Sequence, residues 1–275
     1  QADMTVACIE VPLNEAQGFG VMSVDEGMRV TAFDEKPASP KNLPGRPDLA
    51  LASMGIYVFN ARFLFEQLQR DADDPKSSHD FGKDVIPHCV KRYRTFAQSF
   101  TDSHVGDPDK PPYWRDVGTL DAYWEANMDL VQVNPQLNLY DENWPLWTWQ
   151  PQSPPAKFVF DDDTRRGIAV NSLASGGCII SGATVRRSML FSGVFVDSYT
   201  VVEDSIVLPS VHIGQNCLLK KCIIDRNCRI PDGTQIGVDP EKDRLRFRVT
   251  ASGIVLVSRA MLDQDFSAMR TYETS

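Results

Sequence analysis

The apolar positions follow one pattern up to about residue 133 and another from about residue 172. In the first part they form short runs between turns. Three of these runs predict β-strands, at 4–11, 28–33 and 49–59. Asn60 and Thr119 each precede apolar residues at helical spacing, which predicts two capped helices. A third, short helix is expected to start after Ser78 and to stop near Pro87.

In the second part, apolar residues recur every six positions. The series is Ala183, Met189, Phe195, Val201, Val207, Ile213 and Leu219, and Ile224, Ile230 and Ile236 continue it one residue out of phase. A step of six fits neither a helix nor an alternating strand. It is typical of a hexapeptide β-helix, in which each face contributes one inward side chain per turn. The phase slip between residues 206 and 219 predicts an extra residue at a corner of the coil.

Five prolines and three tryptophans between residues 134 and 157 mark a boundary between these parts. We therefore divide the chain into a first domain at 1–133, a proline-rich linker at 134–170 and a β-helix domain with a closing strand at 171–275.

The composition is that of an ordinary globular protein, with 42% apolar and 24% charged residues in 275. A net charge of -9 argues against sequence-independent nucleic-acid binding, and no apolar run approaches the length of a membrane span. The six cysteines show no CxxC pair, so we expect reduced thiols in a cytoplasmic protein. Cys222 and Cys228, six residues apart, are interpreted as small packing residues rather than metal ligands.

Candidate binding residues gather in and around the segment Thr31–Pro37. Pro37 disfavours the helical region for Lys36, so Glu35 and Lys36 should stand extended at the end of a strand, where α/β proteins bind ligands. Gly20 allows either a close backbone approach to a ligand or a plain turn. Ser53, in an apolar strand, needs a hydrogen-bond partner from backbone or ligand. The plain alternative for the charged pair is a solvated turn.

Asp116 lies in a turn just ahead of the helix that Thr119 caps. An Asp in such a turn often bonds nearby amides. The alternative role is that of a carboxylate ligand for Mg²⁺, which usually takes one or two carboxylates together with phosphate oxygens.

The order of TAFDEKP, ASMGIYVF, SSHDFGKDVIP, YWRDVGTLDAYW, SGGCIISG and GIVLVSRAML resembles the bacterial glucose-1-phosphate adenylyltransferases, also called ADP-glucose pyrophosphorylases. The resemblance implies part of an α/β nucleotidyltransferase domain, a mixed sheet with helices, followed by a left-handed parallel β-helix, and assembly as a homotetramer. It also implies ATP and α-D-glucose 1-phosphate as substrates, ADP-glucose and diphosphate as products, Mg²⁺ as cofactor and a role in glycogen biosynthesis.

The resemblance also implies roles for particular residues. Gly20, Glu35, Lys36 and Ser53 match the family's contacts to glucose 1-phosphate and ADP-glucose, and the 1–133 domain would be its sugar-phosphate-binding part. Neighbouring residues of a regular strand face opposite sides, so Glu35 and Lys36 can reach one sugar only if the chain bends at Pro37 or the strand is irregular.

Asp116 matches the family's second metal carboxylate and is the expected catalytic and metal-binding residue. Arg226 and Arg259 match the allosteric anion site, whose effectors would be a sugar phosphate or pyruvate and an adenine nucleotide. Asp263 falls where some members have another arginine, which leaves the activator undetermined.

The family's glycine-rich nucleotide loop, its first metal aspartate and its adenine pocket would lie upstream of Gln1. We therefore expect a C-terminal fragment that is inactive by itself. Three alternatives stay open: a hexapeptide acyltransferase with His212 as catalytic base, a non-catalytic regulatory homologue, and a nucleotidyltransferase for another sugar phosphate.

Overall fold

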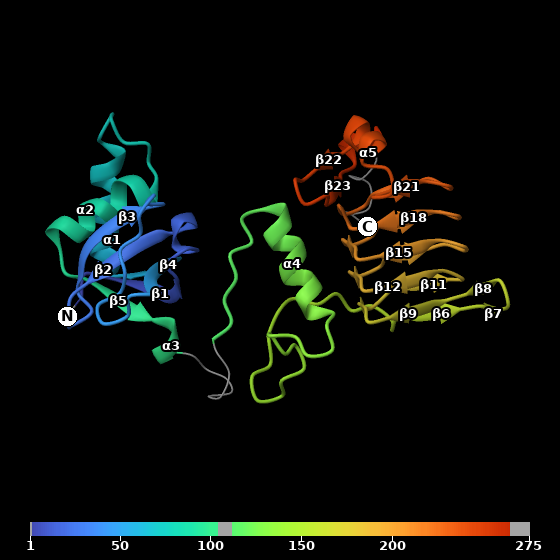
Figure 1. The fold of residues 1–275 in the computed structure, drawn as a ribbon, viewed down its shortest axis with the longest axis horizontal. Helices are drawn as coiled ribbons and strands as arrows, with labels where there is room; N and C mark the ends of the chain where they lie inside the picture. The colour runs from blue at the N-terminus through green and yellow to red at the C-terminus, as the bar shows by residue number, and fades with distance from the viewer. Residues whose placement is uncertain (1, 104–111, 265–275) are drawn as a thin grey trace. The chain divides into compact units, whose positions relative to one another are not determined.

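The computed structural model describes residues 2–103 and 112–264, which fall into two compact units, 1–112 and 113–275 (Figure 1). The second unit therefore begins ahead of the linker that the sequence predicts. Each unit has its own hydrophobic core.

The first unit is built on a five-stranded sheet of order β3-β2-β4-β1-β5. Its strands are β1 (Met4–Pro12), β2 (Gly20–Val24), β3 (Val30–Glu35), β4 (Leu49–Phe59) and β5 (Thr95–Ser99). β1 runs antiparallel to β4 and parallel to β5, so the sheet is mixed, as expected. The strand predicted at 28–33 begins and ends two residues later, because Met28 has a positive φ of 60° and belongs to the preceding turn.

Helices cover this sheet: α1 (Ala61–Ala72), a π-helical turn η2 (Phe81–Val85), α2 (Ile86–Arg92) and the short α3 (Phe100–Ser103), with a 3₁₀ turn η1 (Ala16–Gly18). Asn60 caps α1, as predicted, because its side chain accepts a hydrogen bond from the Phe63 N–H. The stop expected at Pro87 is wrong. α2 begins there instead, since proline lacks an N–H and fits the first turn of a helix.

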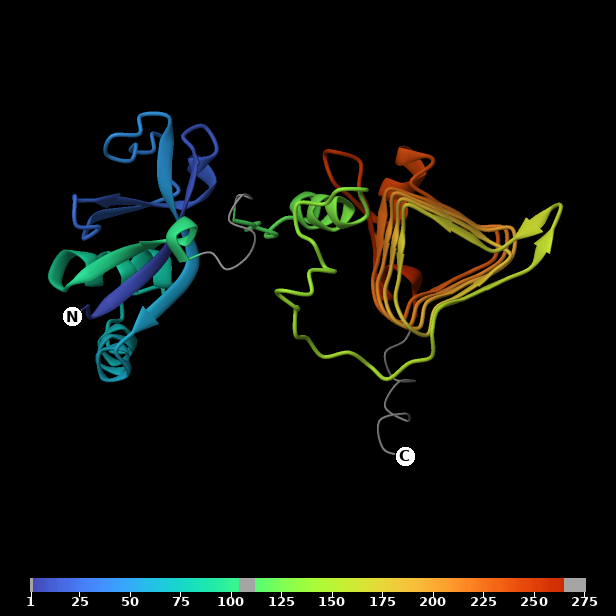
Figure 2. The same ribbon diagram turned by 90° about the horizontal axis from the view of Figure 1, so that it is seen from below.

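The second unit is a coil of short parallel strands whose cross-section is a triangle (Figure 2). The first face contains β10 (Leu173–Ala174), β13 (Met189–Leu190), β16 (Ile206–Val207), β19 (Cys222–Ile224), β23 (Val255–Val257) and, antiparallel at its edge, β22 (Arg248–Val249). The second face contains β6 (Lys157–Val159), β11 (Ile179–Ser181), β14 (Phe195–Val196), β17 (His212–Ile213) and β20 (Arg229–Ile230). The third face contains β9 (Ile168–Val170), β12 (Thr184–Arg186), β15 (Val201–Glu203), β18 (Leu218–Lys220) and β21 (Gln235–Ile236).

Three further elements decorate the coil. A hairpin of β7 (Asp161–Asp162) and β8 (Arg165–Arg166) projects from one corner, and α5 (Pro240–Arg246) and the 3₁₀ turn η3 (Ala260–Leu262) lie near its C-terminal end (Figure 1). The coil extends further towards the N-terminus than the boundary predicted at residue 171, because β6 and β9 pair with coil strands. The expected linker at 134–170 is therefore too long.

The coil has hexapeptide repeats, but the positions that face inward differ from those predicted. Ile180 pairs with Val196, 16 residues on, whereas Leu190 pairs with Val207 and Val207 with Ile224, 17 residues on, so one turn of the coil takes 16 or 17 residues rather than 18. Each turn is thus shorter than three full hexapeptides, where the sequence predicted an extra residue at a corner. As a result Val207 points inward as expected, whereas Phe195 and Val201 face outward and their neighbours Val196 and Val202 fill the core.

Helix α4 (Leu120–Leu130) lies along the first face of the coil (Figure 2). Met128 and Val131 on the helix side pack against Ile206, Ile223 and Ile254. This burial places α4 in the second unit, although the sequence assigned residues 120–130 to the first domain.

All six cysteines are buried and unpaired. Burial raises the pKa of Cys222 to about 12 and that of Cys228 to about 11, which keeps both thiols neutral. They pack inside the coil, as the sequence interpretation expects. Among residues 2–103 and 112–264, no helix is long and apolar enough to cross a membrane.

Candidate functional site

Three of the predicted binding residues lie side by side across the sheet of the first unit. Glu35, the last residue of β3, pairs with Gly20, the first residue of β2. On its other side β2 pairs with β4 through Val21 and Ala52, so the next step along both strands sets Gly20 beside Ser53. Residues opposite one another in antiparallel strands share a face of the sheet. The register therefore brings Glu35, Gly20 and Ser53 into one row.

Gly20 is buried at the centre of this row because its neighbours leave no room for a side chain. A Cβ there would lie 2.5 Å from the ring of Phe33 and 2.9 Å from the carboxylate of Glu35. Both distances are shorter than real Cβ contacts, so an added Cβ would force the Phe33 and Glu35 side chains to shift. The glycine is thus needed for close approach within a strand, not for a turn.

Lys36 departs from the extended backbone that Pro37 was expected to impose. Its φ is +46°, in the left-handed half of conformational space, and its N–H donates to the Phe19 carbonyl at 3.0 Å. Such a conformation costs a non-glycine residue about 1 kcal/mol or more, so the surrounding contacts must hold it. The strand ends at Glu35 and its side-chain alternation ends with it. The geometric objection to Glu35 and Lys36 reaching one ligand therefore does not apply.

Ser53 lies in β4 at a β-bulge, where the pairing with β1 jumps from Cys8–Ser53 to Ala7–Ile56. Its side chain is buried, and its hydroxyl oxygen accepts a hydrogen bond from the Gly55 N–H at 3.3 Å. Backbone thus supplies one partner of the hydroxyl. The hydroxyl proton is left as a donor.

The loop 77–84 lies against Glu35, which sequence reasoning did not anticipate. A Cβ on Gly82 would be 3.1 Å from a Glu35 carboxylate oxygen. Asp84 holds the loop by accepting hydrogen bonds from the N–H and hydroxyl of Ser78 and from the Asp80 N–H. Ser78 and Asp80 hold the pKa of Asp84 below its usual range. In the sequence HDFGKD, the one available signal was the glycine that follows a capping aspartate.

Asp71, buried at the end of α1, holds the same loop through two hydrogen bonds. It accepts hydrogen bonds from the Ser77 hydroxyl at 2.8 Å and from the His79 ring at 3.0 Å. His79, then Ser77, lower the pKa of this carboxyl. His79 has a φ of +58°, so the carboxylate stabilises a loop in a strained conformation.

Asp116 belongs to the second unit and forms the turn that the plain interpretation expects. One carboxylate oxygen accepts from the Gly118 N–H at 3.0 Å. Thr119 then caps α4 by accepting from the Ala122 N–H at 3.1 Å, as predicted. The side chain of Asp116 is exposed, and its second oxygen has no partner within the described residues. A free carboxylate oxygen suits Mg²⁺ as one ligand of an incomplete set, since no cluster of three metal-binding side chains occurs in the described ranges.

The two candidate regulatory arginines follow neighbouring strands of the coil. β19 and β23 pair in parallel, Ile224 opposite Val257, and the Asp225 N–H donates to the Val257 carbonyl at 2.8 Å. Arg226 and Arg259 each stand two residues beyond this pair, and hence at the same level. Arg226 is exposed and Arg259 is 8% exposed. The return of the C-terminal strand to the coil therefore places the two residues just after the ends of neighbouring strands.

His212 has a packing role. Its ring stacks on that of Phe195 with centroids 4.7 Å apart and an interplanar angle of 11°. This arrangement gives no support to a catalytic base on the coil.

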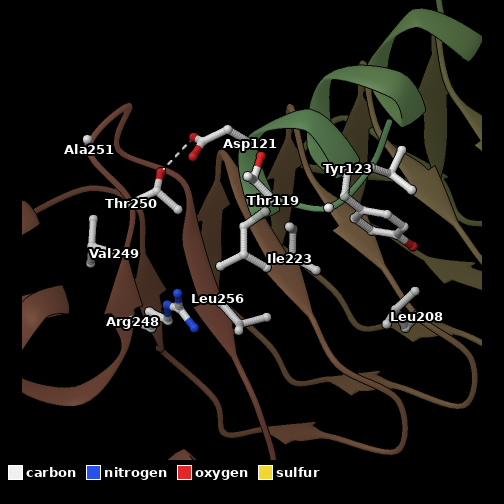
Figure 3. Close-up of a pocket in the computed structure, with 13 residues that line it drawn as sticks. Thr119, Asp121, Tyr123, Leu208, Ile223, Arg248, Val249, Thr250, Ala251 and Leu256 are labelled. Carbon is white, nitrogen blue, oxygen red and sulfur yellow. Dashed lines mark hydrogen bonds between the residues drawn. The ribbon is translucent and has the colours of Figure 1, made fainter. Parts of the chain in front are cut away.

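A cavity of about 750 Å³ opens between the start of α4 and the β22–β23 hairpin (Figure 3). Its floor is apolar and comes from the first face of the coil, with Leu208, Ile223 and Leu256. Val117 and Gly118, directly after Asp116, also line it. The hairpin and the Asp116 segment thus meet at this cavity.

Two families match the chain. The nucleotidyl transferase family matches residues 1–133. The family described as "GlmU-like, C-terminal hexapeptide" matches residues 154–257. The first match accounts for residues that a hexapeptide acyltransferase would leave unexplained.

Curated relatives match almost the whole chain. A glucose-1-phosphate adenylyltransferase of Dechloromonas aromatica is 64% identical over 96% of this chain and 60% of its own length. Those of Methylobacillus flagellatus and Nitrosospira multiformis are 63% and 61% identical, each over 98% of this chain and 63% of their own length. The chain thus spans about three fifths of the length of these relatives.

Proposed function

Because this chain belongs to the glucose-1-phosphate adenylyltransferase family, we propose that it is the sugar-phosphate-binding and regulatory part of an enzyme that converts ATP and α-D-glucose 1-phosphate to ADP-glucose and diphosphate. The observation that carries the proposal is the row of Glu35, Gly20 and Ser53, with Lys36 at its end. The register sets an acceptor, a glycine without a side chain and a hydroxyl donor side by side, next to a cation.

Each residue has a chemical role in this proposal. Lys36 provides a positive charge for the sugar phosphate, and Glu35 accepts hydrogen bonds from sugar hydroxyls. Ser53 donates its remaining proton to the ligand, since its oxygen already accepts from Gly55. Gly20 allows these groups to approach one another.

Asp116 would hold Mg²⁺ through its free carboxylate oxygen. When bound, Mg²⁺ offsets negative charge on the phosphates of the nucleotide. The role of Asp116 itself is to keep one oxygen available, and the hydrogen bond from Gly118 to the other oxygen fixes the direction of the carboxylate. The 275-residue sequence contains no glycine-rich phosphate loop, so we expect this chain alone to make no ADP-glucose.

Regulation would use Arg226 and Arg259, whose positions after paired strands suit a bidentate grip on a phosphorylated or carboxylated effector. The proposal includes a left-handed coil, assembly of four copies, and a cytoplasmic enzyme of glycogen biosynthesis. Adenine nucleotides are the expected second class of effector.

The test is kinetic and uses the complete protein. Lys36→Ala removes a charge-assisted contact worth about 1.5 to 3 kcal/mol, so the KM for glucose 1-phosphate should rise about 10- to 100-fold. The control is Lys41→Ala, which loses an exposed lysine 3.7 Å from Asp34 in the same unit. An unchanged KM in Lys36→Ala would contradict the assigned role. A complete protein that makes no ADP-glucose would support the non-catalytic alternative, and preference for another sugar phosphate would support the sister activity.

A further inference from the structure

The turn that carries Asp116 rests on helix α4. Arg115 donates to the side chain of Gln136, just beyond the C-terminal end of α4, at 2.8 Å. The backbone N–H of Gln136 in turn donates to Asp129 in the last turn of the helix at 3.2 Å. At the other end Thr119 caps the helix three residues after Asp116. The position of α4 therefore determines the position of the Asp116 carboxylate.

Apolar packing alone allows a helix to slide, but polar contacts fix α4 at its first turn. The Thr250 hydroxyl donates to Asp121 at 2.9 Å (Figure 3). The Ser252 hydroxyl donates to the same carboxylate oxygen. Both hydroxyls come from the tip of the β22–β23 hairpin, about 130 residues away in sequence. Ser252, then Thr250, lower the pKa of Asp121, so the carboxylate is charged at neutral pH.

The hairpin side of this contact is itself held rigidly. The Thr250 N–H donates to the Ile254 carbonyl at 2.9 Å, and the Thr250 hydroxyl oxygen accepts from the Ile254 N–H at 3.1 Å. Lys221, on the coil, donates to the Ser252 carbonyl at 2.7 Å. A second tether, from the Trp124 indole to the Asp204 carbonyl at 2.8 Å, anchors the helix one turn later. The hairpin thus offers a fixed point to the start of α4.

We propose that Asp121, Thr250 and Ser252 form a clasp that positions the Asp116 turn, with Asp121 as a positioning residue for the proposed metal carboxylate. The proposal rests on the proposed function in assigning Asp116 a metal, but the clasp itself is independent of it. The proposed role of Asp121 is positional, through its hydrogen bonds to the hairpin. It acts by restricting where α4 starts, and a displacement of about 1 Å at a reacting group is enough to slow a reaction substantially.

The experiment compares variants of the complete protein. Asp121→Ala removes the clasp from the helix side, and Thr250→Val with Ser252→Ala removes it from the hairpin side. Asp121→Asn keeps an accepting oxygen, so this variant should behave like the wild type in both measurements described below. Glu125→Ala is the matched control, because Glu125 is exposed on the same helix and makes no hydrogen bond or ion pair in the part of the chain that the structure describes.

Two readouts separate positioning from simple stability. Without metal, amide hydrogen exchange in residues 113–119 should accelerate about tenfold in Asp121→Ala and in the hairpin variant, and stay at the wild-type rate in Glu125→Ala. In the activity assay, the Mg²⁺ concentration for half-maximal rate should rise about fivefold or more in the clasp variants, with the KM for glucose 1-phosphate within about twofold of wild type.

The outcomes are distinguishable. Exchange in residues 113–119 equal to that of Glu125→Ala would overturn the clasp, as would a lower melting temperature with unchanged Mg²⁺ dependence. If Asp121→Ala does not fold, the same two measurements on Thr250→Val with Ser252→Ala test the clasp. A wild-type protein without adenylyltransferase activity would refute the proposed function, while the exchange measurement would still decide whether the clasp positions the turn.

Discussion

At Gly20 the absence of one methyl group leaves room for the ring of Phe33 and the carboxylate of Glu35. This position is more sensitive to substitution than the exposed residues around it, because any added atom must displace the Phe33 ring or the Glu35 carboxylate. Lys36 shows the same dependence on backbone, since a left-handed φ ends the strand where the charged pair stands.

Gly20→Ala should raise the KM for glucose 1-phosphate about tenfold in the complete protein. Overpacking typically costs about 1 to 3 kcal/mol, and here the strain falls on the Phe33 ring and on Glu35. Gly18→Ala is the control, because no atom lies within 4 Å of a Cβ at that position and its φ is not positive. Steady-state kinetics of both variants check the prediction, and equal KM values would contradict it.

At the scale of elements, loops in this protein are shaped by carboxylates at the ends of helices. Asp71, at the end of α1, accepts hydrogen bonds from Ser77 and His79. The segment that begins with these residues continues to Gly82, which lies against Glu35. Asp121 does the equivalent at the start of α4. In both cases one acidic side chain connects a helix end to a segment outside that helix.

We expect Asp71→Asn to lower the melting temperature of the complete protein at pH 7. The folded-state pKa of Asp71 is lowered, so its contribution to stability is present above the ordinary value near 4 and is lost as the pH falls through the folded value. The difference from wild type should therefore shrink as the pH falls below about 4. Thermal unfolding at pH 7 and pH 3.5 tests this, with Asp73→Asn, an exposed neighbour, as control. A pH-independent difference would show that the charge of Asp71 is not what stabilises the loop.

At the scale of the whole molecule, the closing strand returns the chain to a face of the coil that it had left after β19. β23 returns to pair with β19 after an insertion that includes α5 and β22, which places Arg259 level with Arg226. The same hairpin carries Thr250 and Ser252 at its other end. A regulatory site at the arginines would therefore share an element with the clasp on α4.

In the complete protein, Arg259→Ala should raise the activator concentration for half-maximal stimulation several-fold, because allosteric coupling is typically about 1 to 3 kcal/mol. Titrations with fructose 1,6-bisphosphate, fructose 6-phosphate and pyruvate measure it, and Arg244→Ala, an exposed arginine on α5, is the control. Asp263 is negative where a cation would help a doubly phosphorylated ligand. A strong preference for the bisphosphate would contradict that argument, and an unchanged activation curve would remove Arg259 from the site.

Local sequence determined the elements whose signals are themselves local. The apolar run of β4 is as predicted from Leu49 to Phe59, the caps Asn60 and Thr119 are where their side chains indicated, and the six-residue period identified the coil. The family resemblance also came from motifs readable along the chain, and the relatives bear it out.

Only the tertiary structure decided what depends on closure of the chain on itself. Val201 and Val202 are both apolar, so the sequence could not tell which of them faces inward until the 17-residue turn fixed the phase. The row of Glu35, Gly20 and Ser53 needs the register of three strands, and the clasp joins residues about 130 positions apart. Periodicity and capping are properties of neighbouring residues, whereas inward phase, cross-strand rows and long-range hydrogen bonds arise only when distant segments pack together.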